Sequence, residues 1–247
     1  MNKLPKITLL FWIMKIAATT LGETAGDLLS MTLNVGYAVS SMILIGVFLV
    51  TVAAQLKSKT YHPLLYWTVI LSTSTAGTTL SDYMDRTLGL GYAKGTFILI
   101  CILTVIFVYW RFSAHSFSVQ NIRTFKVELL YWTAILFSNT LGTALGDFLA
   151  DDSGLGFAGG ALLIGSLLAL TVLFYYFTRI SKTLLFWTAF VLTRPFGATM
   201  GDVLTKSHEK GGLGFGTIGS SLILGLALGI LIFYTSANPD KDSKTSE

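Results

Sequence analysis

Charged residues and cysteines are scarce in this chain of 247 residues. Aspartate, glutamate, lysine and arginine together make up 12% of it, which is about half their share in soluble globular domains. The low charge argues against a soluble fold, and a hydrophobic content of 53% indicates a membrane protein instead. The single cysteine, Cys101, excludes both a disulfide within the chain and a cysteine metal cluster.

Eight stretches are long and apolar enough to cross the ~30 Å hydrocarbon core as helices. They cover approximately residues 7–29, 35–56, 63–86, 92–114, 127–149, 155–178, 183–204 and 212–235. We therefore expect an all-α polytopic membrane protein with eight transmembrane helices. The first stretch contains Lys15 and Glu23 and is the first copy of a repeated unit, so we expect it to be a span and not a cleaved signal peptide.

The basic residues gather on one side of these spans. The segments on the other side hold only Arg86, Lys206 and Lys210. The positive-inside rule then places both termini in the cytoplasm. The net charge of +4 is explained by topology, and it indicates no nucleic-acid partner.

One short stretch recurs four times, and each copy ends in an aspartate that lies fifteen residues after a tryptophan. The aspartates are Asp27, Asp82, Asp147 and Asp202, and the tryptophans are Trp12, Trp67, Trp132 and Trp187. The copies are 55, 65 and 55 residues apart, so the second pair repeats the first pair after 120 residues. This spacing predicts four two-helix repeats of one orientation, arranged in two duplicated halves.

The predicted halves are residues 1–118 and 119–236, and each contains two hairpin repeats. The repeats cover about 7–56, 63–114, 127–178 and 183–235. The aromatic pair at each tryptophan is typical of an interfacial aromatic belt at the start of a membrane helix. Residues 237–247 are polar and lack apolar periodicity, which predicts a disordered cytoplasmic tail.

Hydroxyl and carboxylate side chains share one face of the first helix in each repeat. Residues three, four and seven positions before an aspartate lie on its face of a helix. These positions include Glu23, Thr20, Thr24, Thr78, Thr79, Thr143 and Thr199. We expect Glu23 and the four aspartates to be metal ligands, with the threonines and Arg194 as supporting groups.

Small residues form a second stripe about 100° away from the aspartate face. The pairs are Gly22 with Gly26, Gly77 with Ser81, Gly142 with Gly146, and Gly197 with Gly201. Such small-xxx-small spacing allows helices to approach closely in lipid. We therefore expect these residues to be packing surfaces that hold the aspartate faces near a common axis.

The aspartates need compensating positive charge. Each lies toward the carboxy-terminal end of its predicted helix, where the macrodipole disfavours an anion. The basic residues inside the predicted spans, Lys15, Lys94 and Arg194, are too few to balance them. A bound metal ion or protons are expected to supply the rest. Arg194 either neutralises a neighbouring acid or extends its side chain toward the inner interface.

Oxygen ligands of this kind suit hard cations such as Mn²⁺, Mg²⁺ or Ca²⁺. We expect no cofactor, because the divalent cation would be the transported substrate. An enzyme is not expected either. The residue three positions before each aspartate is a threonine or an alanine, whereas intramembrane aspartyl proteases have glycine there, and other catalytic motifs are absent from the sequence.

The repeated Trp, Thr-x-Gly and Gly-Asp landmarks resemble a family of small bacterial integral membrane proteins described as uncharacterised membrane-anchored repeat proteins. The resemblance covers nearly the whole chain and implies a location in the bacterial inner membrane. It implies no activity.

The leading functional hypothesis is a membrane transporter of a small cation, with a divalent metal as the expected cargo and proton exchange as the coupling. Two alternatives stay open. One is a pseudo-fourfold cation channel in which the four aspartates form a ring at the mouth. The other is a non-transporting membrane scaffold or regulator whose repeats serve only for packing.

Overall fold

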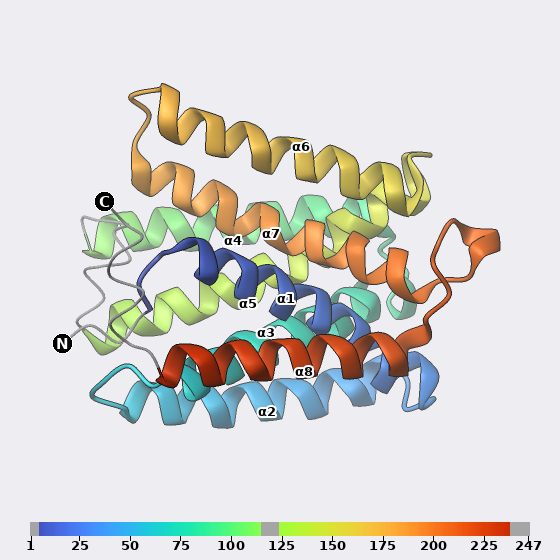
Figure 1. Ribbon diagram of the computed structural model, residues 1–247, viewed down its shortest axis with the longest axis horizontal. Coiled ribbons are helices and arrows are strands. Elements are labelled where there is room, and N and C mark those ends of the chain that lie inside the picture. The colour runs from blue at the N-terminus through green and yellow to red at the C-terminus, as the bar shows by residue number, and fades with distance from the viewer. Residues whose placement is uncertain (1–4, 115–123, 238–247) are drawn as a thin grey trace.

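The computed structural model describes residues 5–114 and 124–237, and this part of the chain consists of helices and turns. Its long helices are α1 (Leu9–Asp27), α2 (Tyr37–Lys57), α3 (Pro63–Asp82), α4 (Tyr92–Ala114), α5 (Phe125–Asp147), α6 (Gly156–Phe177), α7 (Lys182–Thr205) and α8 (Gly216–Ala237). Figure 1 shows them running side by side along the long axis of the molecule. The predicted all-α class is confirmed, and each helix lies within a few residues of its expected span.

The first helices of the four repeats form a closed inner ring. Helix α1 contacts α3, α3 contacts α5, α5 contacts α7, and α7 contacts α1 again. Most threonine and serine side chains of the repeated stretches, and all four repeat aspartates, are buried in this ring. The polar part of each repeat is therefore enclosed by the bundle.

The second helix of each repeat packs chiefly on the first helix of the following repeat and less on its own. Helix α2 packs on α3, α4 on α5, α6 on α7, and α8 closes the circle on α1. The outer helices therefore lie at the periphery, and Figure 1 shows α2 and α6 at opposite edges of the bundle. Each repeat is thus packed against the next one, and the repeats are not independent hairpins.

The four outer helices, α2, α4, α6 and α8, are long and apolar enough to cross a membrane. Large apolar side chains on them remain exposed, such as Phe97, Leu162 and Leu222. Among the described residues, the ring helices do not reach the same hydropathy, because threonines, serines and charged groups interrupt them. A membrane protein follows from the outer helices, whose exposed apolar surface implies contact with the lipid bilayer.

Glycines bring neighbouring ring helices into close contact. A Cβ atom on Gly77 would lie 2.9 Å from backbone atoms of Asn139 and Thr140 in the next ring helix. The equivalent glycines contact the equivalent neighbours around the ring, namely Gly22 with Ser74, Gly142 with Arg194 and Gly197 with Thr19. The predicted role of the glycine stripe as a packing surface is confirmed.

Aromatic side chains fill the ring at the end where its helices begin. Trp67 and Trp132 are 2% and 1% exposed, and the hydroxyls of Tyr66 and Tyr131 lie 3.0 Å apart in the interior. These two tryptophans lie near the start of their helices, as expected for an interfacial aromatic belt, but their side chains are buried inside the bundle. The residues on the ring face at this end are large, so they fill the space inside the bundle.

The turn after each aspartate contains a glycine at or just before the first residue of the second helix. Gly36, Gly91, Gly156 and Gly214 have φ angles of 80°, 73°, 67° and 70°. Residues with a side chain rarely adopt such positive φ angles, which explains why a glycine recurs at this point of every repeat.

Three segments lie outside the described residues, namely 1–4, 115–123 and 238–247. The predicted boundary between the halves at residues 118 and 119 falls in one of them. Almost all of the predicted disordered tail, residues 237–247, falls in another.

Candidate functional site

The repeat aspartates lie together at one end of the ring. Asp27, Asp82 and Asp147 are the last residues of α1, α3 and α5, and Asp202 lies three residues before the end of α7. Their exposure is only 2–4%. Helix α7 continues through Pro195, and the other ring helices are unbroken up to their aspartates. A π-helical segment of five residues follows the aspartate in α1, α3 and α5. The carboxylates therefore lie near the carboxy-terminal ends of their helices, where the macrodipole disfavours an anion.

Three carboxylates from three ring helices approach one another most closely. Oxygen atoms of Glu23 on α1, Asp147 on α5 and Asp202 on α7 all lie within 4.8 Å of one another. All three residues are buried. The structure thus brings Glu23 together with two of the four predicted aspartate ligands in an arrangement that could hold one metal ion. We call these three residues the close cluster.

Arg194 on α7 forms an ion pair with Glu23 of this cluster. Its Nη1 atom is 3.0 Å from Glu23 Oε2, and the arginine side chain has no exposed surface. The guanidinium also donates hydrogen bonds to the hydroxyls of Thr78 and Thr143 and to the backbone carbonyls of Thr19 and Ser74. Of the two alternatives for Arg194, the structure therefore supports the buried counter-ion.

The predicted threonines divide into two groups. The hydroxyls of Thr78 and Thr143 each donate a hydrogen bond of 3.2 Å to Glu23 Oε2, so they belong to the cluster. The other hydroxyls donate to backbone carbonyls of their own helices, namely those of Thr20, Thr24, Thr79 and Thr199. Thr24 also accepts a hydrogen bond from Ser221 on α8. These four threonines are not brought to the carboxylates.

Two cations that we expected only in outer loops are bound to the aspartates. Arg86 Nε lies 3.0 Å from Asp82 Oδ1, and its Nη2 lies 3.4 Å from Asp147 Oδ2. Lys206 Nζ lies 3.0 Å from Asp202 Oδ1 and 3.1 Å from Asp27 Oδ2. Each cation therefore bridges the aspartates of two neighbouring repeats.

The sequence contains a signal for these two residues. Each lies four positions after an aspartate, which is the spacing of neighbours on a helix surface. They are also 120 residues apart, so they occupy the same place in the two duplicated halves. As basic residues outside the cytoplasmic segments, Arg86 and Lys206 indicate only the orientation of the spans.

The four repeat aspartates and Glu23, together the acidic cluster, carry more charge than the cations bound to them. Four aspartates and Glu23 face three cations, Arg86, Arg194 and Lys206. Burial lowers the pKa of Lys206, but Asp202 and Asp27 outweigh it and hold that pKa above its ordinary value, so the amine is charged at neutral pH. With every group ionised, the carboxylates exceed the cations by two. One divalent cation or two protons would neutralise this excess.

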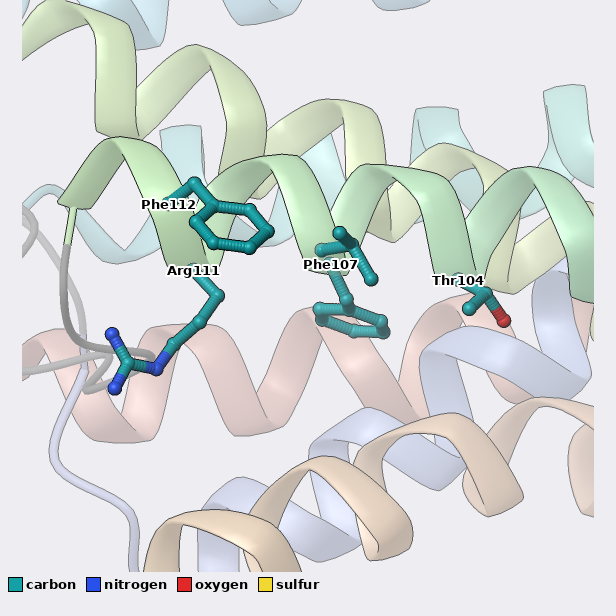
Figure 2. A pocket seen from close by; sticks show the side chains of 5 residues that line it. Thr104, Phe107, Arg111 and Phe112 are labelled. Atoms are coloured by element: carbon teal, nitrogen blue, oxygen red, sulfur yellow. The ribbon is translucent and has the colours of Figure 1, made fainter.

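Other features of the structure lie apart from the cluster. Asp85 points toward Gly95 on α4, and its Oδ2 accepts a hydrogen bond from Ser81. Figure 2 shows a surface hollow of a different kind, lined by Thr104, Phe107, Val108, Arg111 and Phe112. These five residues all belong to α4, and none is part of the acidic cluster.

The sequence matches a family model at four places. The family is described as a repeat of unknown function (DUF347), and the copies cover residues 10–61, 65–116, 130–181 and 185–238. Each copy covers most of one ring helix and the outer helix that follows it. No curated protein and no solved structure matches the chain. Because the four copies cover most of its length, the chain belongs to the DUF347 repeat family.

Proposed function

We propose that the protein is a transporter of a small cation that binds at Glu23, Asp147 and Asp202. The observation that carries this proposal is the approach of the three carboxylates to within 4.8 Å inside the helix ring. Bringing three anionic groups together in a buried site is costly unless positive charge is present. The three cations around the cluster offset part of this cost, and a bound ion would offset the remainder.

The expected cargo is a divalent metal ion of the Mn²⁺, Mg²⁺ or Ca²⁺ class. The close cluster offers carboxylate oxygens, with the hydroxyls of Thr78 and Thr143 beside them. Such oxygens are the ligands that hard cations prefer. The charge of a divalent ion also equals the excess of carboxylates over cations in the cluster.

Protons are the expected coupling ion. When the metal leaves, the carboxylates regain two uncompensated charges in a buried place, and protonation is the simplest way to remove them. The transporter would therefore exchange a divalent cation for protons.

For the membrane arrangement, we propose that all eight helices cross the bacterial inner membrane and that both termini lie in the cytoplasm. The outer helices have the hydropathy of membrane spans. The ring helices are of similar length and run alongside them (Figure 1). Most of their polar side chains are buried inside the protein. The distribution of basic residues supports the orientation.

One observation favours the channel alternative. The four aspartates lie at the same end of four ring helices, as expected for a charged ring at a pore mouth. Flux distinguishes the two functions. A carrier gives saturable, pH-coupled uptake into liposomes, whereas a channel gives a conductance far above the turnover of a carrier. A scaffold gives neither.

The proposal is tested by metal-dependent heat stability and by uptake of Mn²⁺ into proteoliposomes. We expect Asp147→Asn combined with Asp202→Asn to abolish both the protection and the uptake. The matched control is Asp151→Asn, which removes an exposed carboxylate from the turn after α5. Protection and uptake that survive in the double variant would show that the cluster does not bind the cargo.

A further inference from the structure

Arg86 and Lys206 occupy equivalent positions in two of the repeats, but their side chains are held by different contacts. Arg86 and Lys206 each follow an aspartate by four residues, and each bridges to the aspartate of the next repeat. The corresponding residues of the other two repeats are Met31 and Asp151, neither of which is a cation. The clamps therefore occur at alternate repeat boundaries.

Arg86 is fixed by aromatic neighbours. Its Nη1 atom donates a hydrogen bond of 3.2 Å to the Tyr37 hydroxyl, and its guanidinium lies 5.9 Å from the ring of Tyr37 and 5.6 Å from the ring of Tyr92. A planar guanidinium between two rings and two carboxylates has little freedom to move. Arg86 thus joins α2, α4 and the ring helices into one unit.

Lys206 is held by the two carboxylates alone, as far as its described side-chain contacts show. Its ammonium group binds Asp27 and Asp202, and no aromatic contact of the kind seen at Arg86 is found for it in residues 5–114 and 124–237. The side chain is 21% exposed, whereas those of Asp27 and Asp202 are 6% and 4% exposed. The ammonium therefore approaches the acids from the solvent side, on a flexible four-carbon stem.

Both clamps share a carboxylate with the close cluster, since Arg86 binds Asp147 and Lys206 binds Asp202. They differ in how free they are to leave it. Asp202 is both a partner of Lys206 and a member of the trio with Glu23 and Asp147. A metal ion bound to Asp202 and the ammonium of Lys206 would repel each other at short range in a poorly solvated site. The metal ion and the Lys206 ammonium therefore cannot both bind Asp202 at full strength.

We propose that Lys206 is a tethered counter-ion, which occupies the carboxylates of Asp27 and Asp202 while the site lacks cargo and turns out toward solvent when a divalent cation enters. Without Lys206 the five carboxylates exceed Arg86 and Arg194 by three, so a divalent cation leaves one carboxylate that keeps a proton. Arg86 stays in place as a fixed clamp. This inference rests on the proposed function, because it assigns the competitor that the cargo must displace.

The test uses the purified full-length protein in detergent, with Mn²⁺ as the probe. We expect Lys206→Gln to lower the unfolding temperature in chelator, because two buried carboxylates lose their partner, and Mn²⁺ to restore it. The apparent Mn²⁺ affinity should be at least tenfold tighter than in the wild type. Arg86→Gln should lower the unfolding temperature in chelator but tighten the Mn²⁺ affinity less than Lys206→Gln does, because the guanidinium contacts Asp147 only at 3.4 Å. Lys210→Gln, an exposed charge in the same loop, is the matched control.

A second measurement follows Lys206 itself. Acylation of lysines by a water-soluble amine reagent, quantified by mass spectrometry, should rise severalfold at Lys206 when Mn²⁺ is added, relative to Lys210. Wild-type protein that binds Mn²⁺, combined with a Lys206→Gln variant of equal or weaker affinity, would overturn the tethered counter-ion alone. An equal gain in Arg86→Gln would overturn the distinction between the two clamps. If neither the wild type nor Lys206→Gln responds to Mn²⁺, Mg²⁺ or Ca²⁺, the proposed function itself fails.

Discussion

Arg194 Nη1 lies 3.0 Å from Glu23 Oε2, and both side chains are almost completely removed from solvent. The two residues break the repeat pattern together. The other repeats have Thr19, Ser74 and Asn139 at the position of Arg194, and Thr78, Thr143 and Ala198 at the position of Glu23. The ring is otherwise rich in hydroxyls at these two positions, and this acid and this base are joined directly between the neighbouring helices α1 and α7.

This pairing predicts a strong dependence of stability on Arg194. Arg194→Met leaves Glu23 buried without its cation, and breaking such a pair costs about 3–5 kcal/mol. We expect a large fall in the unfolding temperature in detergent. The double variant Arg194→Met with Glu23→Gln removes the unpaired charge, so it should recover a large part of the loss. Additive losses in the double variant would contradict a direct pairing.

The glycine contacts predict a size limit at Gly77. A Cβ there meets backbone atoms of the next ring helix at 2.9 Å, and backbone cannot move aside easily. Gly77→Ala should therefore destabilise the protein by about 1–3 kcal/mol. Gly46→Ala in α2 is the matched control, since nothing lies within 4 Å of its Cβ position. This control should be neutral or slightly stabilising, because alanine favours a helix. Equal effects at both positions would argue against close ring packing.

Replacing Lys15 is expected to stabilise the protein, in contrast to the two substitutions above. Its side chain is completely buried, and within the described residues its Nζ atom has no hydrogen-bond partner and lies 4.1 Å from the centre of the Phe190 ring. A buried amine without such a partner is costly, so Lys15→Met should raise the unfolding temperature. A clear fall on this substitution would mean that Lys15 binds a group that stabilises it in the folded protein.

The charge balance of the cluster predicts that metal and protons compete. Binding of one Mn²⁺ should release about two protons if Lys206 stays on its carboxylates and about one if Lys206 turns out toward solvent. Mn²⁺ protection against heat should therefore weaken as the pH falls and strengthen as it rises. A weakly buffered solution containing a pH-indicator dye would measure the release directly. Proton release unchanged in Asp147→Asn combined with Asp202→Asn would place its source outside the cluster.

The proposed topology predicts opposite sides for two exposed lysines. Lys59 follows α2, and Lys210 lies in the turn after α7. In a Cys101→Ala background, an impermeant maleimide applied to cells whose inner membrane is intact should label Lys210→Cys and not Lys59→Cys. Labelling of Lys59→Cys alone would reverse the orientation, and labelling of both would contradict the proposed crossing of the membrane.

The sequence determined the parts of this protein that follow from local pattern. Apolar runs of about 20 residues specify the eight helices, and the recurring Trp, Gly and Asp landmarks specify four repeats. Helical spacing was also enough to separate the glycine stripe from the aspartate face, because both depend only on positions within one helix. Even the equivalence of Arg86 and Lys206 is contained in the 120-residue period.

Only the tertiary structure decided which helices meet. The closure of the ring between α7 and α1 brings Arg194 to Glu23, and it brings Lys206 to Asp27, across 171 and 179 residues of chain. The same arrangement turns Thr78 and Thr143 toward Glu23 while Thr20 and Thr79 bond to their own helices. Such contacts depend on the rotation and depth of each helix against its neighbours. Spacing along one helix does not fix these quantities, so the ion pairs between neighbouring ring helices could not be derived from the sequence.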